Sequence, residues 1–242
     1  MSAPASSSVP GESAGLVYNL GWVFGRLMLF GFCRGRVTGV EHLPKAGPAL
    51  LACNHASYLD PIFVGSATWR PLTYLGRATL FEHRLFGAVI RSTNSIPLDR
   101  DGGGPAGLRT VLNALAQGRA VVLFPEGTRT RDGRLQPVRP GVGLIALKSA
   151  APVVPVWLEG TFQVWGRDRR VPRPARVEIR FGPPVDLAPL RAAAATAGRE
   201  QLKALYASAA QAILAALAAQ GRVPMPPPPS TGGFSGPTGE AA

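Results

Sequence analysis

The sequence has little charge, little cysteine and little histidine for its 242 residues. Charged residues make up 17% of the chain and hydrophobic residues 46%, with a mean hydropathy of +0.12, which is apolar for a soluble protein. Of its two cysteines, Cys53 lies inside an apolar run, so we expect no disulfide framework and a reducing compartment. We therefore expect a protein of the cytoplasmic face of the cell membrane, peripheral or monotopic.

Acidic residues are also scarce, since 14 Asp and Glu stand against 26 Lys and Arg and give a net charge of +12. Such a field attracts nucleic acid, anionic lipid and phosphorylated ligands alike. No helix-turn-helix, zinc-finger spacing or basic-aromatic motif appears, so we expect no nucleic-acid partner. His42 and His83 lack matched partners and form no ligand spacing with His55. We therefore predict no metal site and no cofactor.

The length suits a single α/β domain with two tails. Residues 1–14 are rich in Ser, Ala, Gly and Pro, and residues 221–242 carry a run of prolines, so both are predicted to be disordered. Between them we expect a hydrophobic helical segment at 15–36 and the main domain at 37–220.

The segment from Leu16 to Cys33 is almost entirely apolar and aromatic, and is nearly long enough to span a bilayer. Arg26 and Asn19 interrupt it, and a central arginine costs roughly 2.5–3.5 kcal/mol on insertion. We favour a helix that lies in or dips into the membrane interface. A true span and a buried core helix are the alternatives, and we do not expect a cleaved signal peptide, because the segment lacks a basic start and a small-residue cleavage site.

Short apolar runs alternate with helical patterns along the rest of the chain. The expected strands are Ala49–Cys53, Ala120–Phe124, Val153–Leu158 and Val177–Phe181, the first three fully buried. Helices are expected around Leu108–Leu115, ending before Gly118, over Gly141–Ser149, and as a long C-terminal helix with one apolar stripe from Leu202 to Leu217. The alternation predicts an α/β fold with a mainly parallel central sheet flanked by helices, whose functional loops follow the carboxyl ends of the strands.

A polar cluster, residues 54–61, opens directly after the first buried run and contains His55 and Asp60. On a regular helix two residues five apart would lie about 140° from each other, so these two meet only if a turn separates them. Asp60 suits a helix N-cap and Pro61 the first helical position, which supplies that turn. A carboxylate on one imidazole nitrogen would leave the other free to take a proton from a hydroxyl, so His55 and Asp60 are the predicted catalytic residues.

Three other interpretations of this cluster stay open. Asp60 could act only as a helix cap. Ser57 could form a Ser-His-Asp triad, although no G-x-S-x-G elbow is present and three members within so few residues would be cramped. Cys53 could be a nucleophile, although a buried cysteine is normally inert.

A second cluster, Phe124 to Arg129, follows the second buried run. Gly127 permits a tight turn, so that Glu126 and Arg129 project from a rigid loop. Glu126 could accept a hydrogen bond from a polyol hydroxyl and Arg129 could fork onto phosphate. An internal ion pair between these two residues is the alternative.

Two further basic features carry weaker signals. Arg100 follows a third apolar run and could be a second phosphate ligand, or it could belong to a surface cluster with Asp99 and Asp101. The loop that holds Arg167, Arg169, Arg170, Arg173 and Arg176 could rest on anionic lipid or be a solvated loop.

In order and spacing, four motifs resemble those of the glycerolipid (lysophospholipid) acyltransferase family: Asn54-His55 with Asp60, Ile96 to Arg100, Phe124 to Arg129, and Val154-Pro155-Val156. The resemblance covers roughly residues 39–184, and its first and third motifs together are highly specific.

The resemblance implies a mechanism and a set of ligands. His55, oriented by Asp60, would be the general base for a glycerol hydroxyl that attacks an acyl thioester directly, and residues 37–220 would be the acyltransferase domain. Arg100, Glu126, Gly127, Thr128 and Arg129 would bind the acceptor. The donor would be acyl-CoA or acyl-acyl carrier protein, and the segment at 15–36 would dock on an anionic membrane surface.

The resemblance also leaves alternatives for the acceptor. Asn94-Ser95 and the stretch from Arg77 to Leu80 depart from the family pattern near the acceptor side. Lysophosphatidate is the leading acceptor, with another lysophospholipid or a lyso-aminolipid as alternatives. A non-catalytic membrane-binding protein on the same scaffold is the rival from a different class.

Overall fold

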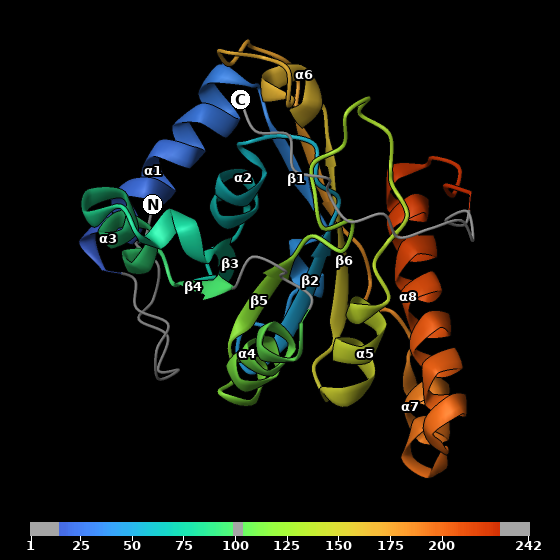
Figure 1. The fold of residues 1–242 in the computed structure, drawn as a ribbon. Helices are drawn as coiled ribbons and strands as arrows, with labels where there is room; N and C mark the ends of the chain where they lie inside the picture. Colours follow the sequence, from blue (N-terminus) through green and yellow to red (C-terminus); the bar gives the residue numbers. More distant parts are fainter. Residues whose placement is uncertain (1–14, 99–103, 228–242) are drawn as a thin grey trace, which may run out of the picture.

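A computed structural model describes residues 15–98 and 104–227 of the chain. Figure 1 shows a central sheet with helices on both faces. The N-terminal half contains α1 (Leu16–Arg26), η1 (Leu27–Phe32), β1 (Arg36–Thr38), η2 (Val40–His42), β2 (Ala49–Cys53), α2 (Asp60–Ala67), β3 (Tyr74–Arg77), η3 (Ala78–Phe81), α3 (Arg84–Ser92) and β4 (Ser95–Leu98). The C-terminal half contains α4 (Pro105–Ala116), β5 (Ala120–Leu123), α5 (Gly141–Lys148), β6 (Val153–Glu159), α6 (Thr161–Trp165), β7 (Glu178–Phe181), α7 (Ala188–Thr196) and α8 (Arg199–Gly221).

The main sheet has the strand order β1-β7-β6-β2-β5, and its pairs are parallel except for the antiparallel pair β6–β7. A parallel bridge between Thr73 and Val121 joins the smaller parallel pair β3–β4 to the edge at β5. The predicted mainly parallel α/β sheet is therefore confirmed. The four expected strands are present, each within one residue of the predicted bounds.

β2 lies at the centre of the sheet and all five of its residues are buried. Its side chains alternate between the two faces, as the pleat requires. Leu51 and Cys53 join the core cluster that contains α2, whereas Leu50 and Ala52 join the cluster that contains α4, α5 and α8. Two separate apolar layers thus fix β2, and with it the position of every residue that follows Cys53.

The predicted N-terminal helix is confirmed as one continuous helical segment, formed by α1 and η1, which packs on α2. One side of it is buried through Tyr18, Gly25 and Leu29. The other side is exposed and apolar, through Leu16, Leu20, Val23, Phe24 and Leu27. Their spacing of three and four residues makes them a single face. The alternative of a buried core helix is therefore wrong for this segment.

Arg26 points toward the protein and away from that apolar face. Its guanidinium lies 4.7 Å from the ring centroids of Trp22 and Phe30 and 4.9 Å from that of Trp69. It also donates a hydrogen bond of 3.1 Å to the carbonyl of Ser66 in α2. The arginine that interrupts the apolar segment in the sequence is thus accommodated by three aromatic rings and a carbonyl.

The C-terminal helix α8 is, in the part of the chain that the structure describes, the one helix long and apolar enough to cross a membrane by length and composition. It packs on α5 and β6, burying Ile213, Leu214 and Leu217 of the predicted stripe. Gly143 of α5 approaches so closely that a Cβ there would collide with the carbonyl of Tyr206. Such contacts are those of a core helix of the domain.

Candidate active site

Two loops meet where β2 and β5 end, because these strands are parallel and in register, with Ala52 opposite Leu123. Asn54 fixes the loop that follows β2 by bonding to the backbone of the neighbouring strand β6. Its side-chain amide donates to the carbonyl of Leu158 at 3.1 Å and accepts from the amide of the same residue at 2.7 Å. The carboxyl end of β2 is thereby tied to β6 just before His55.

His55 and Asp60 lie in contact, as the sequence predicts. His55 Nδ1 is 2.8 Å from Asp60 Oδ2, and the histidine side chain keeps 18% of its surface exposed while the aspartate side chain is fully buried. The imidazole stacks on Phe124, with ring centroids 4.0 Å apart and an interplanar angle of 21°. Nε2 has no hydrogen-bond partner among the described residues. The ring is therefore held at one nitrogen and on one face, and is free at the other nitrogen.

Asp60 is held by the turn that precedes it. Oδ2 accepts hydrogen bonds from the backbone N–H groups of Ala56 at 2.6 Å and Ser57 at 2.7 Å, in addition to the one from the His55 side chain. Asp60 is the first residue of α2, and the N-cap position belongs to Leu59 without any side-chain cap bond. The interpretation of Asp60 as the N-cap is thus wrong, because its carboxylate faces backward to the loop and the imidazole.

Glu126 supports the loop that carries His55. Oε1 accepts the backbone N–H of His55 at 2.7 Å, and Oε2 accepts that of Gln136 at 3.0 Å. The side chain is buried, and burial raises its pKa to about 7 against the lowering effect of these two hydrogen bonds, while the charge of Asp60 adds to the rise. Both carboxylate oxygens thus contact backbone amides, whereas the sequence suggested a contact with a substrate hydroxyl.

Arg129 is held by an aromatic ring. Its guanidinium carbon lies 3.4 Å from the ring centroid of Tyr58, whose other neighbour is Trp165 at 5.4 Å between centroids. Nη1 is buried and makes no hydrogen bond. Within the described ranges Arg129 forms no ion pair with Glu126, so the alternative of an internal pair does not hold. Arg129 therefore has donor capacity to spare beside the His55 loop.

Gly127 and Thr128 form the exposed turn between Glu126 and Arg129. Gly127 has a φ of +76°, and a Cβ there would collide with the guanidinium of Arg139. Glycine is thus favoured by the backbone conformation, and a side chain here would also displace the Arg139 guanidinium. The loop is completed by Thr130, whose N–H donates to the carbonyl of His55 at 2.8 Å.

The two nucleophile alternatives do not agree with the geometry. The Ser57 hydroxyl donates to the carbonyl of Trp165 at 2.9 Å and accepts from the amide of Leu59 at 3.1 Å, so it faces away from His55. Cys53 is completely buried in the core, and burial together with the charge of Asp60 raises the pKa of its thiol. Neither residue can serve as an activated nucleophile for His55.

Arg100, together with Asp99 and Asp101, lies outside the described residues, so its role as a phosphate ligand stays a prediction. Four residues of the site escaped sequence reasoning: Tyr58, Phe124 as a stacking partner, Gln136 and Arg139. Tyr58 and Phe124 stand inside the two motifs and could have been singled out as aromatic neighbours. Gln136 contributes only its backbone N–H to Glu126, and Arg139 packs against Gly127 from a later part of the loop. No sequence pattern marks contacts of either kind.

Comparison with known proteins identifies a family for these motifs. The family model described as Acyltransferase matches residues 34–159. A 1-acyl-sn-glycerol-3-phosphate acyltransferase of Bacillus subtilis is 30% identical over 126 residues, covering 52% of this chain and 62% of that protein. One of Limnanthes douglasii is 31% identical over 157 residues, covering 62% of this chain and 54% of the relative.

Two broader matches extend over more of the chain. A 1-acyl-sn-glycerol-3-phosphate acyltransferase of Salmonella typhimurium is 27% identical over 79% of this chain and 76% of its own length. The crystal structure of the 1-acyl-sn-glycerophosphate acyltransferase PlsC from Thermotoga maritima superposes with a TM-score of 0.63 at 22% identity, covering 81% of this chain and 78% of that one. The structural match shows that the two proteins share a fold. The chain spans only 54–62% of the length of the first two relatives.

Proposed function

This chain belongs to the acyltransferase family, and we propose that it transfers a fatty acyl group from an acyl thioester to the free hydroxyl of lysophosphatidate, forming phosphatidate. The observation that carries the proposal is the contact of 2.8 Å between His55 Nδ1 and Asp60 Oδ2, which leaves Nε2 free beside a loop that holds a spare guanidinium. The names of the Bacillus and Limnanthes relatives support the acceptor.

The chemistry follows from the tautomer that Asp60 selects. With its proton on Nδ1, His55 presents an unprotonated Nε2 that can take the proton of the acceptor hydroxyl. The hydroxyl oxygen attacks the thioester carbonyl carbon, the C–S bond breaks, and the proton on Nε2 passes to the departing thiolate. The base is regenerated and no acyl-enzyme forms. The reaction as written requires neither a metal nor a cofactor.

Binding of the acceptor is assigned to the turn that follows β5. The half-buried guanidinium of Arg129 can donate to a phosphate oxygen, and the Tyr58 ring lies against it. Gly127 and Thr128 lie exposed on the same turn, where they can approach the acceptor. Arg100 is proposed as a second phosphate ligand. Glu126 acts indirectly, since its carboxylate holds the backbone of His55.

We also propose that the protein works as a peripheral protein on the cytoplasmic face of the membrane. The exposed apolar face of α1 and η1 carries Leu16 at 75%, Leu20 at 60% and Leu27 at 67% exposure, and it faces outward from the domain. An amphipathic surface of this kind favours partition into the membrane interface. The acyl donor is acyl-CoA or acyl-acyl carrier protein, either of which can approach from the aqueous side.

The experiment that tests the proposal measures free thiol released from a panel of acyl-CoA donors, with lysophosphatidate as acceptor. Wild type is compared with His55→Ala and with His83→Ala, a control that removes an exposed histidine at the start of α3. We expect acceptor-dependent release from wild type and the control, and loss of release in His55→Ala. Repeating the assay with acyl-acyl carrier protein identifies the donor.

Two outcomes would contradict the proposal in different ways. Transfer to another lysophospholipid or to a lyso-aminolipid, with none to lysophosphatidate, would support acyl transfer as the reaction and contradict lysophosphatidate as the acceptor. No thiol release with any donor and acceptor, in a protein that still binds vesicles, would favour the non-catalytic membrane-binding rival. Against this rival stands the intact His55–Asp60 pair, since membrane attachment needs neither residue.

A further inference from the structure

A cavity of about 720 Å³ lies where the N-terminal helical segment ends, between the end of η1 and the irregular segment that leads into β7. Its lining residues are Gly31, Phe32, Cys33, Arg34, Pro174, Ala175 and Arg176. None of them belongs to the His55 site described above. Cavities that hold small ligands enclose roughly 300–1,000 Å³, so the space is large enough for a lipid headgroup.

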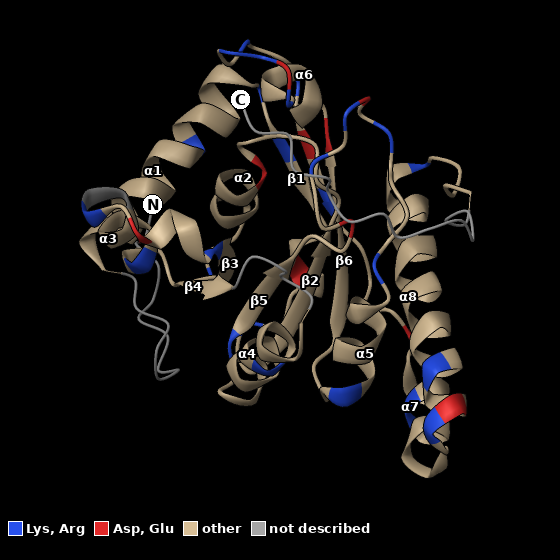
Figure 2. Cartoon of the chain, in the orientation of Figure 1, with Lys and Arg blue, Asp and Glu red and all other residues tan. Residues whose placement is uncertain are grey.

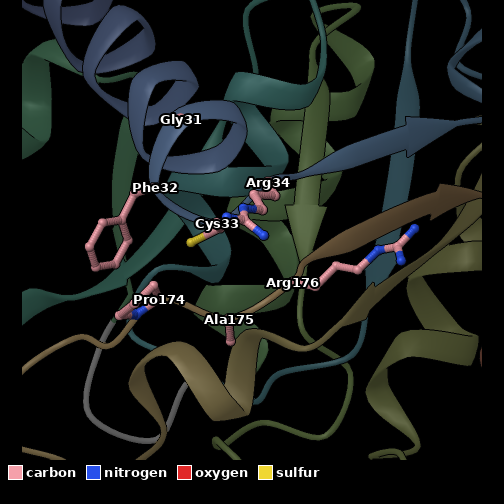
Figure 3. Close-up of a pocket in the computed structure, with 7 residues that line it drawn as sticks. All are labelled: Gly31, Phe32, Cys33, Arg34, Pro174, Ala175 and Arg176. Atoms are coloured by element: carbon pink, nitrogen blue, oxygen red, sulfur yellow. The ribbon is translucent and has the colours of Figure 1, made fainter.

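The cavity has a cationic side and an apolar side. Figure 3 shows the Arg34 side chain over the gap toward Ala175, with the Cys33 sulfur beside it and the Phe32 ring farther to the left, while Arg176 extends to the right, past the rim. Neither arginine has an ion-pair partner within the described ranges. A ligand that suits both sides carries a negative charge next to apolar groups.

Arg34 occupies an unusual backbone position. Its φ is +48°, in the left-handed region that favours glycine, although Gly35 follows immediately. The turn is fixed by hydrogen bonds from the N–H of Cys33 to the carbonyl of Met28 at 2.9 Å, and from that of Gly35 to the carbonyl of Leu29 at 2.7 Å. Glycine would be the ordinary residue where a helix ends in this way. A charged residue in this strained position points to a role for its side chain.

The surroundings of the cavity are strongly basic and adjoin the apolar helix face. The loop from Gly166 to Val177 holds five arginines and one acidic residue, Asp168. Figure 2 shows this basic loop beside α6, near the end of the N-terminal helical segment. The amide of Val177 donates to the carbonyl of Cys33 at 3.3 Å, which joins loop and helix end. With α1 and η1 in the membrane interface, the cavity would open at the level of the headgroups.

We propose that this cavity binds the phosphate of an anionic phospholipid of the membrane, with Arg34 as its principal ligand, Arg176 at its rim and Phe32 against the adjoining apolar part of the lipid. The site is separate from the acceptor site at Arg129. Its effect is to select anionic membranes and to fix the end of the N-terminal helical segment on them.

The test measures cosedimentation of the full chain with vesicles of phosphatidylcholine alone and of phosphatidylcholine mixed with phosphatidylglycerol. Arg34→Gly removes the charge and relieves the left-handed backbone, so loss of folding does not confuse the result. We expect it to weaken binding to the anionic vesicles by about tenfold or more, since one arginine in a diffuse field contributes only about fivefold. Binding to phosphatidylcholine alone should stay that of wild type.

A second pair of variants adds an apolar side chain, at the cavity or away from it, without changing charge. A Cβ at Gly31 meets nothing within 4 Å, and neither does one at Gly21 on the same helical segment away from the cavity. Gly31→Leu adds apolar surface, which alone would strengthen membrane binding, yet it should reduce the preference for anionic vesicles. Gly21→Leu should keep that preference.

Three results would overturn the proposal. Arg167 is a loop arginine that does not line the cavity. If Arg167→Gln weakened binding to anionic vesicles as much as Arg34→Gly does, the attraction would come from the general positive charge and not from the cavity. Gly31→Leu could keep the full anionic preference, which would mean that the cavity is not occupied. Titration with CoA in the absence of vesicles could show binding that Arg34→Gly abolishes, which would assign the cavity to the phosphates of a donor. These readouts require no transferase activity, so they are independent of the proposed reaction.

Discussion

The guanidinium of Arg129 lies over the ring of Tyr58, with 3.4 Å between its central carbon and the ring centroid. The backbone amide of Tyr58 in turn donates to the carbonyl of Trp165 at 3.2 Å, so the backbone that carries the ring is tied to α6. Nη1 is buried without a hydrogen bond, but the residue as a whole is only half-buried, so the exposed part of its guanidinium remains for a ligand.

Replacing the ring should therefore change acceptor binding more than turnover. Tyr58→Ala is expected to raise the KM for lysophosphatidate by roughly 2- to 30-fold, since a cation–π contact is worth about 0.5–2 kcal/mol, with little change in kcat. Tyr58→Phe keeps the ring and should behave as wild type. Steady-state kinetics of both variants check this, and a Phe variant as weak as the Ala variant would assign the effect to the hydroxyl.

Asp60 should act on turnover through His55. Asp60→Asn removes the charge that holds the Nδ1 proton, so we expect kcat to fall by about 10²- to 10⁴-fold. In a His55→Ala background the same change should cost almost nothing further, because residues that act as a unit are not additive. Thiol release from the two single variants and the double variant measures the coupling. A further fall in the double variant would mean that Asp60 contributes independently of the imidazole.

Glu126 should make stability depend on pH. Its pKa in the folded state, about 7, lies above the ordinary value of 4.5, so the folded protein keeps a proton that the unfolded chain has released between these two values. The proton on Glu126 adds about 3 kcal/mol to the free energy of unfolding. This stabilisation is fully present below pH 4.5 and is lost as the pH rises through 7.

The matched variant for this effect is Glu126→Gln, which cannot titrate. Its baseline stability should be lower, because an amide N–H₂ replaces one acceptor of the backbone bonds from His55 and Gln136. Urea unfolding from pH 4.5 to 7.5 should show wild type losing stability relative to the variant as pH rises. Parallel curves for the two proteins would show that Glu126 has an ordinary pKa.

Gly143 should be required for the packing of α5 on α8. A Cβ there would collide with the carbonyl of Tyr206 and lie 2.8 Å from the amide of Ala210, so Gly143→Ala is expected to cost about 1–3 kcal/mol. Gly141→Ala, in the first turn of the same helix, meets nothing within 4 Å and should be neutral or slightly stabilising. Equal urea midpoints for the two variants would contradict this packing.

The sequence was most informative where burial is uniform. β2 and β6 were predicted within one residue because every position of β2, and all but the last of β6, is buried. β1 was missed because it has three residues, one exposed and none buried, and β3 and β4 because they too lack buried residues. Strands of this kind form from pairing with partners distant in the sequence, and local pattern carries little of that information.

The site was predicted in its residues and less well in their contacts. The pairing of His55 with Asp60 followed from a turn that spacing could indicate. That Oδ2 of Asp60 would accept three hydrogen bonds, and that Glu126 would face the backbone of His55, depends on how two loops from different strands meet. Spacing along one chain segment does not determine such contacts.

Arg26 has a consequence for the order in which the protein is assembled. Its charge is covered by Trp69 and by the carbonyl of Ser66, which come from the chain around α2 and not from its own helix. Before that part of the domain has folded, the N-terminal segment exposes a cation in its middle and is a poor candidate for insertion during synthesis. We therefore expect attachment to lipid to follow folding, so that the protein reaches its membrane as a finished domain.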